Sequence, residues 1–316
     1  MERNNEIDLE LDSEILEIIK DDINIYEIKE EFDIPIYLSK KIGTKKKILV
    51  LSGGGIKGIA LLGSLFALEE AQLLNNFEIF AGASVGALTI ALFIIGYKPK
   101  EIFNFLKSFD LGKLKYINIF NFLQYKGIDN GVRLEYVIRR LIEAKGINPD
   151  ITLKELYELK KKKIIFSTVC LNTSSVNYLS FETFPNLPLI IAIRMSISIP
   201  LFYTPVFYNK NIYIDGGCID NYPIKLFDHC LDDVLGIYLT DLPNKIDEIN
   251  DIETYLIKLF DGFMQGMTIN AKKGYEKYTI SIDLKSVNII NYELSDEQKQ
   301  ELFNKGYNIT KSLIIQ

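Results

Sequence analysis

A serine between small residues is the side chain of this sequence best suited to nucleophilic chemistry. Residues 82–86 read Gly-Ala-Ser-Val-Gly. This G-x-S-x-G pattern is typical of a strained strand-to-helix turn that exposes the serine hydroxyl, and small neighbours let the strand and helix pack closely. We therefore expect Ser84 to be a nucleophile, with Gly82 and Gly86 as the glycines of its turn. The same pentapeptide also occurs in ordinary turns, so its flanking elements decide the interpretation.

A carboxylate with a comparable setting occurs far along the chain. Asp215 directly follows the apolar stretch Asn-Ile-Tyr-Ile and precedes Gly216 and Gly217. Open α/β sheets bind their ligands beyond the ends of their strands, which makes Asp215 a candidate general base. The alternative is a simple strand-ending turn, because Asp-Gly is a common turn pair.

A glycine-rich run connects an early predicted strand to a predicted helix. It comprises Gly53, Gly54, Gly55, Lys57 and Gly58. The run fits G-x-G-x-x-G, but a dinucleotide site also needs an acidic residue at the end of the next strand, and Glu69 and Glu70 fall inside the predicted helix. Backbone N–H groups of such a run at a helix N-terminus also suit an oxyanion. Lys57 either adds positive potential there or is a solvated lysine.

The only histidine, His229, offers an alternative base. Ser84, Asp215 and His229 follow the chain order of α/β-hydrolase triads. However, His229 lies in a short amphipathic stretch between Asp228 and Asp232, as a surface histidine would. One histidine and three cysteines without metal-ligand spacing predict no metal site, and we expect no cofactor.

The apolar pattern predicts an α/β fold, with a mostly parallel sheet between two layers of helices. Strands are predicted at 47–52, 76–84, 162–172, 176–183, 211–217, 233–240 and 278–284. Helices are predicted at 59–73, 85–97, 133–144, 152–159, 188–197 and 251–272. A last helix follows the capping-box pair Ser295 and Gln298, and we expect Gly306 to interrupt it.

The chain divides into an acidic N-terminal extension, residues 1–46, and one domain, residues 47–316. We expect the motifs to occupy a core at about 47–228, with further helices and a strand at 229–316. The net charge of -6 and pI near 5.2 argue against broad binding to nucleic acid. Without a signal-like segment or an apolar run of bilayer length, we expect a cytoplasmic protein, soluble or peripheral to a membrane.

The motifs in their order resemble the patatin-like phospholipases. The resemblance rests on SGGGIKG (52–58), GASVG (82–86) and DGG (215–217). It extends to AIRMSISIPLFYTPV (192–206), DNYP (220–223) and NYELSDEQKQELFNKGY (291–307). It therefore covers most of residues 47–316.

The resemblance implies a lipid acyl hydrolase with a Ser–Asp dyad, no catalytic histidine, and a phospholipid or other acyl-lipid substrate. It makes Ser84 the nucleophile and Asp215 the general base, and it assigns the oxyanion hole to the glycine run, chiefly Gly54 and Gly55. The scheme needs no metal. A basic residue usually follows the glycines in this family, and Lys57 satisfies that.

Transient contact with a membrane surface is expected from two features. Residues 116–125 (YINIFNFLQY) are either a lip at the lipid interface or an ordinary core segment. The basic runs at 45–47 and 160–163 either meet anionic headgroups or are solvated.

Three other functions stay open on sequence alone. One is a catalytically silent lipid-binding module of the same fold, which would bind vesicles without turnover. Another is a nucleotide-binding oxidoreductase, which would bind NAD and be indifferent to Ser84. The third is an esterase that uses His229 in a Ser–Asp–His triad.

Overall fold

The computed structural model describes residues 45–241, 271–284 and 294–314, together with isolated positions between 249 and 262. The predicted N-terminal extension lies outside these residues except for its last two positions. The predicted helix at 251–272 also lies largely outside them, and its last two residues form part of a turn. No helix within the described ranges is long and apolar enough to cross a bilayer.

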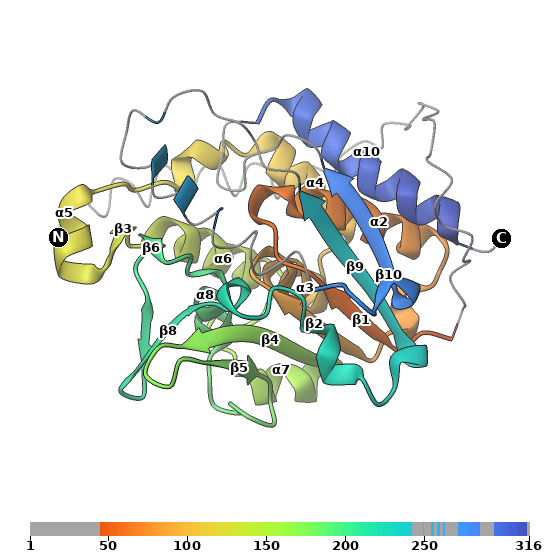
Figure 1. Cartoon of the computed structure of the whole chain (residues 1–316), viewed down its shortest axis with the longest axis horizontal. Helices are drawn as coiled ribbons and strands as arrows, with labels where there is room; N and C mark the ends of the chain where they lie inside the picture. Colours follow the sequence, from red (N-terminus) through yellow and green to blue (C-terminus); the bar gives the residue numbers. More distant parts are fainter. Residues whose placement is uncertain are drawn as a thin grey trace.

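The fold is built on a mixed but mostly parallel sheet (Figure 1). Its strands are β1 (Ile48–Leu51), β2 (Ile79–Ala83), β4 (Lys163–Cys170), β5 (Ser175–Leu179), β7 (Val206–Tyr208), β8 (Asn211–Asp215), β9 (Val234–Asp241) and β10 (Thr279–Leu284). They lie in the order β10-β9-β1-β2-β4-β8-β7, with β5 also paired to β4. The neighbours from β10 to β4 are parallel, and β5, β7 and β8 pair antiparallel. The predicted α/β fold with a mostly parallel sheet is confirmed.

Alternating side chains explain why both faces of the central strands are buried. In β1, Leu49 and Leu51 belong to the large core on one face, and Ile48 and Val50 belong to a smaller core on the other. Successive residues of a strand point to opposite faces, so a strand covered on both sides must be apolar throughout.

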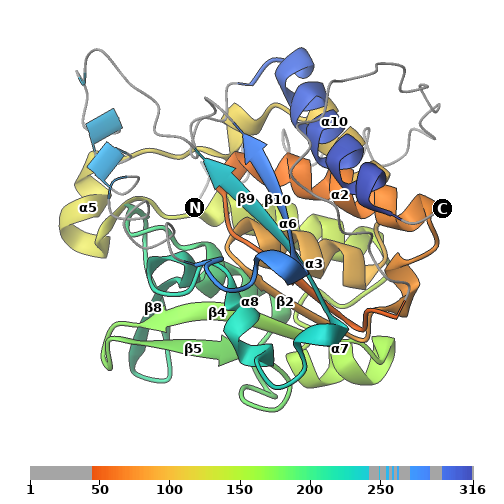
Figure 2. The same cartoon turned by 45° about the vertical axis from the view of Figure 1, so that its right-hand side comes forward.

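Helices cover the larger core (Figures 1 and 2). These helices are α2 (Ile59–Glu70), α3 (Val85–Ile95), α4 (Pro99–Ser108), α6 (Val132–Ala144), α7 (Leu153–Lys160), α8 (Leu189–Ile197) and α10 (Asp296–Leu313). The short helix α5 (Ile119–Tyr125) packs instead against a separate small core. The α3 sequence, VGALTIALFII, contains no charged residue, as expected for a helix enclosed on all sides. The smaller core is covered by the short helix η5 (Pro223–Phe227) and residues 271–278.

The register of β4 brings two distant strand ends together. Phe166 pairs with β2 and β5, and Thr168 pairs with β5 and β8. Because a strand has only two edges, β2 and β8 lie on the same edge of β4 and approach each other end to end. Ala83, the last residue of β2, pairs with Ser167, while Asp215, the last residue of β8, pairs with Thr168. The sheet therefore places the residues that follow β2 beside the end of β8.

The expectation that Gly306 interrupts the last helix was wrong. Helix α10 runs continuously from Asp296 to Leu313, and Ser295 and Gln298 form the predicted capping box at its start. A Cβ atom on Gly306 would lie 1.8 Å from the Ala60 carbonyl oxygen in α2. A glycine is therefore required here by the close crossing of two helix backbones rather than by a helix end.

Candidate active site

Ser84 occupies a sharp turn between β2 and α3. Its φ of 51° and ψ of -124° lie in a region that side chains other than glycine rarely adopt. Such strain is the mark of a nucleophile turn. The small neighbours are needed for packing, because a Cβ atom on Gly86 would lie 2.6 Å from the Ser52 carbonyl oxygen, and one on Gly82 would lie 2.8 Å from the Gly86 backbone.

Asp215 contacts the Ser84 hydroxyl directly. Ser84 Oγ donates a hydrogen bond to Asp215 Oδ2 at 2.7 Å, although the two residues are 131 positions apart. The other carboxylate oxygen, Oδ1, accepts the Gly217 N–H at 2.7 Å. The structure thus brings together the predicted nucleophile and base, and Gly216 and Gly217 form the turn that follows the base. The two residues do not follow neighbouring parallel strands, because Asp215 ends β8, which runs antiparallel to β4.

The environment of Asp215 makes it a stronger base than an exposed aspartate. Its side chain is buried, and burial raises its pKa to about 7, although the hydrogen bonds from Ser84 and Gly217 act in the opposite direction. Loss of hydration disfavours the charged carboxylate, and hydrogen bonds to the charged form favour it. A base with a pKa near neutrality is well matched to accepting a proton from a hydroxyl.

A second serine, Ser196 near the end of α8, contacts the turn that contains Ser84. Its fully buried Oγ accepts the Ser84 backbone N–H at 3.0 Å and donates to the Ser167 carbonyl at 2.8 Å. Two residues on, the Ser198 carbonyl accepts the Asp215 N–H at 2.9 Å. Sequence reasoning missed both serines. They lie in AIRMSISIPLFYTPV, one of the stretches that carry the resemblance, which was their only signal.

The glycine run lies beside the serine. Gly54 (φ 158°) and Gly55 (φ 55°) adopt conformations that suit glycine, and Gly55 starts the short helix η1 (Gly55–Gly58). A Cβ atom on Gly53 would lie 3.1 Å from Ser84 Cβ, so this part of the backbone is adjacent to Ser84. The Gly53 N–H itself donates to the Asn221 carbonyl at 3.0 Å.

The last two residues of the run have structural roles. Lys57 is buried, with 1% of its surface exposed, so the solvated-lysine interpretation is wrong. Its backbone N–H closes the η1 turn on the Gly54 carbonyl. Gly58 packs against the nucleophile helix, because a Cβ atom there would lie 2.3 Å from Val85 Cγ2.

His229 lies near the start of the parallel strands, whereas Ser84 lies at their end. It is exposed and precedes the first residue of β9, whereas Ser84 follows the last residue of β2, and both strands run parallel to β1. Ser84 donates directly to Asp215, with no imidazole between them. Among the described residues, no group of three or more His, Cys, Asp or Glu side chains is placed to share a metal ion.

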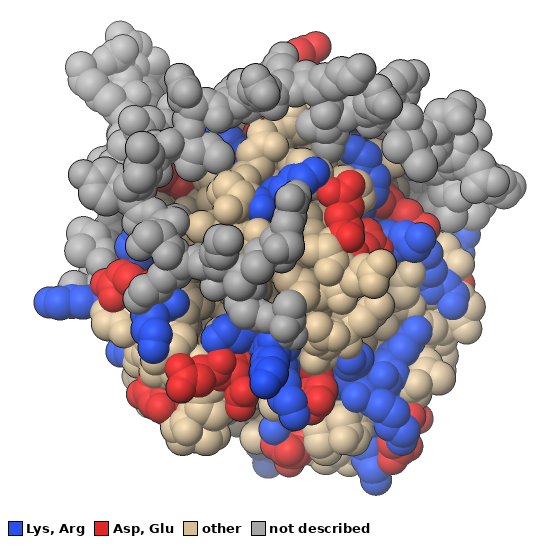
Figure 3. Space-filling model, turned by 90° about the vertical axis from the view of Figure 1, so that its right-hand side faces the viewer, with Lys and Arg blue, Asp and Glu red and all other residues tan. Residues whose placement is uncertain are grey.

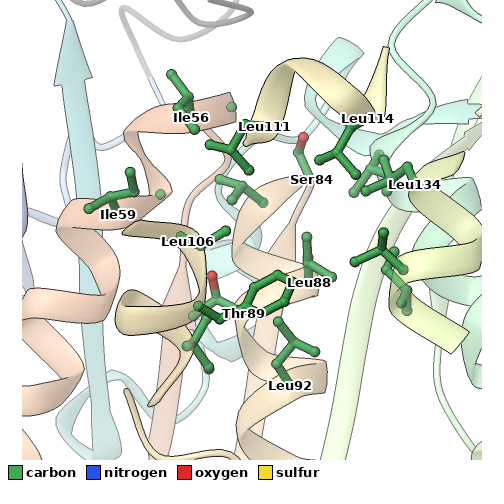
Figure 4. Close-up of a pocket in the computed structure, with 18 of the residues that line it drawn as sticks. Ile56, Ile59, Ser84, Leu88, Thr89, Leu92, Leu106, Leu111, Leu114 and Leu134 are labelled. Carbon is green, nitrogen blue, oxygen red and sulfur yellow. The ribbon is translucent and has the colours of Figure 1, made fainter. Parts of the chain in front are cut away.

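A large apolar pocket opens beside the Ser84 hydroxyl (Figure 4). It contains about 1140 Å³ not filled by protein atoms, open solvent at its mouth included. Ser84, Leu88 and Leu92 line it from successive turns of α3, so it extends for about 12 Å along that helix. Ser84, Thr89, Tyr97 and Tyr203 are the lining residues with a hydroxyl group, and all other lining side chains are apolar. Gly55 of the glycine run lines the pocket as well.

Part of the pocket wall comes from an element that the sequence reasoning missed. Helix α4 contributes Ile102, Phe105 and Leu106. Pro99 at its first position was the available signal, and the Lys98 N–H donates to Glu101 Oε2 at 2.8 Å.

Comparison with known proteins points to one family. A family model described as patatin-like phospholipase matches residues 49–228. An uncharacterised protein, R571 of Acanthamoeba polyphaga mimivirus, is 30% identical over 87% of this chain and 96% of its own length. The probable lipid hydrolase 463L of Invertebrate iridescent virus 6 is 33% identical over 57% of this chain and 62% of its own length.

Among solved structures, VipD from Legionella pneumophila has a similar fold, with a TM-score of 0.54 over 85% of this chain and 66% of that one. The sequence identity of 19% restricts that likeness to the fold. The family model, by contrast, matches more than half of the sequence, including the serine turn, the glycine run and the Asp-Gly-Gly turn. This chain therefore belongs to the patatin-like phospholipase family and is a lipid hydrolase.

Proposed function

We propose that this enzyme cleaves acyl esters of glycerophospholipids, as a phospholipase of the A type, by means of a Ser84–Asp215 dyad. The observation that carries the proposal is the 2.7 Å hydrogen bond from Ser84 Oγ to Asp215 Oδ2 beside an apolar pocket. A hydroxyl bonded to a base is the arrangement of an activated nucleophile. The pocket supplies an apolar surface of the kind that binds an acyl chain.

In the first half of the reaction, Ser84 Oγ attacks the ester carbonyl carbon and its proton passes to Asp215 Oδ2. The carbonyl oxygen becomes an oxyanion, which we assign to the N–H groups of Gly54 and Gly55, because the Gly53 N–H donates to Asn221. The C–O bond to the alcohol then breaks, and the departing lysophospholipid takes the proton from Asp215. The acyl group stays on Ser84.

In the second half, Asp215 accepts a proton from water as that water attacks the acyl-enzyme. The tetrahedral oxyanion forms at the same N–H groups, and its collapse returns the proton to Ser84 Oγ and releases the fatty acid. No step uses a metal ion, so we expect activity to persist in a chelator.

The substrate class follows from two separate arguments. The pocket lining is apolar over about 12 Å below Ser84, which suits one acyl chain rather than a polar or charged substrate. The phospholipid headgroup rests on membership of the family, while the name of the iridescent virus relative, a probable lipid hydrolase, supports only the lipid class.

Product analysis tests this function. Purified protein is incubated with phosphatidylcholine vesicles in EDTA, and we expect equal amounts of fatty acid and lysophosphatidylcholine, with none from Ser84→Ala protein. Release of a phosphorylated headgroup would contradict cleavage at the acyl ester, and a loss of activity in EDTA would contradict the metal-free scheme.

The rate should depend on pH through Asp215. This carboxyl must be deprotonated to accept the serine proton, and its pKa is raised to about 7. We therefore expect kcat/KM for a soluble ester to fall about tenfold for each pH unit below 7 and to level off above it. A profile that is flat from about pH 5 upward would mean that the base titrates like an exposed aspartate.

Ser196→Ala should lower kcat markedly while the protein remains folded. The change leaves the buried Ser84 N–H without its acceptor, at a cost of about 1–3 kcal/mol, and releases the strained turn. We expect kcat to fall about tenfold or more with KM little changed. Ser64 provides a matched control, because its buried Oγ donates to the Ala60 and Gly306 carbonyls at the α2–α10 crossing. An equal loss of kcat in Ser64→Ala would show that general destabilisation is responsible.

We also propose that residues 47–316 act as one catalytic domain, beyond the 49–228 matched by the family model. Two features after residue 228 support this. Strands β9 and β10 complete one side of the sheet, and α10 packs on α2 next to the glycine run.

A further inference from the structure

Residues 116–125 expose an unusual amount of apolar surface. Of the twelve exposed large hydrophobic side chains in the described part of the chain, five belong to this segment. Phe120 is 80% exposed and Leu123 is 88% exposed. The core-segment interpretation is therefore wrong for these side chains. We call Tyr116, Ile117, Phe120, Leu123 and Tyr125, together with the neighbouring Phe207, the α5 surface.

The exposure is a property of one side of α5. Phe120 and Leu123 are three residues apart and so share a side of the helix. Phe122 turns the other way and packs against the small core formed by Ile128, Ile199, Phe202 and Tyr203. The helix is thus anchored by its inner side, while an aromatic and an aliphatic side chain project outward.

The α5 surface is attached to the walls of the pocket. Before it in the chain, the short helix η3 (Leu111–Leu114) contributes Leu111 and Leu114 to the lining, and Leu114 lies close to Ser84 (Figure 4). After it, β3 (Gly127–Asp129) pairs with β6 (Leu201–Tyr203), which supplies the lining residue Tyr203. The helix projects at one end of the molecule (Figure 1).

The charged side chains within this segment are lysines, in a chain of net charge -6. The flanking carboxylates are Asp110 and the buried Asp129, whose Oδ2 accepts the Tyr116 N–H at 2.7 Å. Residues 111–128 contain three lysines, Lys113, Lys115 and Lys126, and no Asp or Glu. The exposed Lys126 lies 5.5 Å from the centre of the Phe207 ring. On the side of the molecule farthest from α5, by contrast, charges of both signs are interspersed (Figure 3).

We propose that the α5 surface inserts into the boundary between headgroups and acyl chains of an anionic bilayer and so brings the mouth of the pocket to its substrate. Outward aromatic and aliphatic side chains with lysines alongside are the composition of an interfacial anchor. A surface that bound only a protein partner would not need the apolar pocket whose walls flank α5 in the chain. The reason for such an anchor, access to lipid substrate, rests on the proposed function. Insertion into a bilayer can be measured without it.

A tryptophan reporter tests insertion without any turnover. The chain contains no tryptophan, so one introduced residue gives the whole indole signal. In a Ser84→Ala background, Leu123→Trp should shift its emission to shorter wavelength with vesicles of equal phosphatidylcholine and phosphatidylserine. The matched control is Leu159→Trp on α7, since Leu159 is also an exposed helix leucine, and it should not shift.

Binding and activity provide the second arm. Phe120→Ser with Leu123→Ser should weaken vesicle binding about tenfold or more and slow hydrolysis of vesicle phospholipid, because two apolar side chains no longer leave water. Leu159→Ser should change neither. A short-chain ester in solution needs no bilayer, so both variants should hydrolyse it at the wild-type rate.

Three results would overturn the proposal. The first is an unshifted Leu123→Trp emission on vesicles that the protein binds. The second is unchanged vesicle binding by the double serine variant. The third is a wild-type oligomer that the double variant converts to monomer, which would make the α5 surface a protein interface. If the wild-type protein fails to hydrolyse any lipid but Leu123→Trp still shifts, the proposed function fails and the membrane surface stands.

Discussion

Ser84→Ala is expected to reduce ester hydrolysis by at least about 10⁴-fold. The change removes the atom that attacks the carbonyl and forms the acyl-enzyme, and neither Asp215 nor the glycine N–H groups can replace it. The measurement is kcat/KM with a soluble ester, so that binding to vesicles does not enter.

The folded state should survive this change. Ser84 contributes no side-chain packing beyond its Cβ atom, and its backbone N–H still has Ser196 Oγ as acceptor. Circular dichroism and the melting temperature verify that the variant is folded. Substantial residual hydrolysis by folded Ser84→Ala protein, with the same products, would place the nucleophile elsewhere.

Asp215→Asn is expected to lower kcat by about 10⁴-fold while it raises thermal stability. An asparagine has nearly the same shape and keeps an oxygen for the Gly217 N–H. Its amide cannot accept the proton of Ser84, so the hydroxyl stays inactive. Activity and stability should therefore move in opposite directions, which a merely structural residue would not produce.

The sign of the stability change follows from the pKa of Asp215. Burial raises that pKa to about 7 in the folded protein, above its unfolded value. The contribution to folding is therefore fully present below the unfolded pKa and is lost as the pH rises through about 7, when a charge forms in the interior. Between the unfolded pKa and about 7, each pH unit lowers the free energy of unfolding by about 1.4 kcal/mol.

At pH 8, Asp215→Asn should therefore be more stable than wild type by at least about 1 kcal/mol, or roughly 2–4 °C in Tm. The difference in stability between variant and wild type should shrink as the pH falls below the raised pKa of Asp215. Thermal melts at several pH values check this. A variant that melts lower than wild type at pH 8 would mean that the carboxylate stabilises the fold, against the burial argument.

The candidate site residues could be located in the sequence because each motif encodes its own local backbone. The strained conformation at Ser84 needs small neighbours, and Gly54 and Gly55 adopt conformations that suit glycine. Strands such as β1 and β9 were recognisable because burial on both faces requires continuous apolar residues. These features depend on neighbours within a few positions.

Features set by distant contacts were not predictable. Nothing near Asp215 encodes that β8 runs antiparallel to β4, and this direction is what brings its carboxylate to Ser84. Ser196 resembles any serine of an apolar helix until α8 packs beside the nucleophile turn. Gly306 was interpreted as a helix breaker, because its real constraint is the backbone of another helix. The exposure of Phe120 and Leu123 likewise contradicts the usual burial of apolar residues.

Mass-spectrometric mapping of a covalent fluorophosphonate label tests most directly the claim that Asp215 alone activates Ser84. The label reports nucleophile reactivity without a lipid substrate or a membrane. We expect wild-type and His229→Ala proteins to carry the label on the peptide containing Ser84 at equal rates, and Asp215→Asn protein to react far more slowly. Loss of labelling in folded His229→Ala protein, or labelling of a different residue, would contradict the claim.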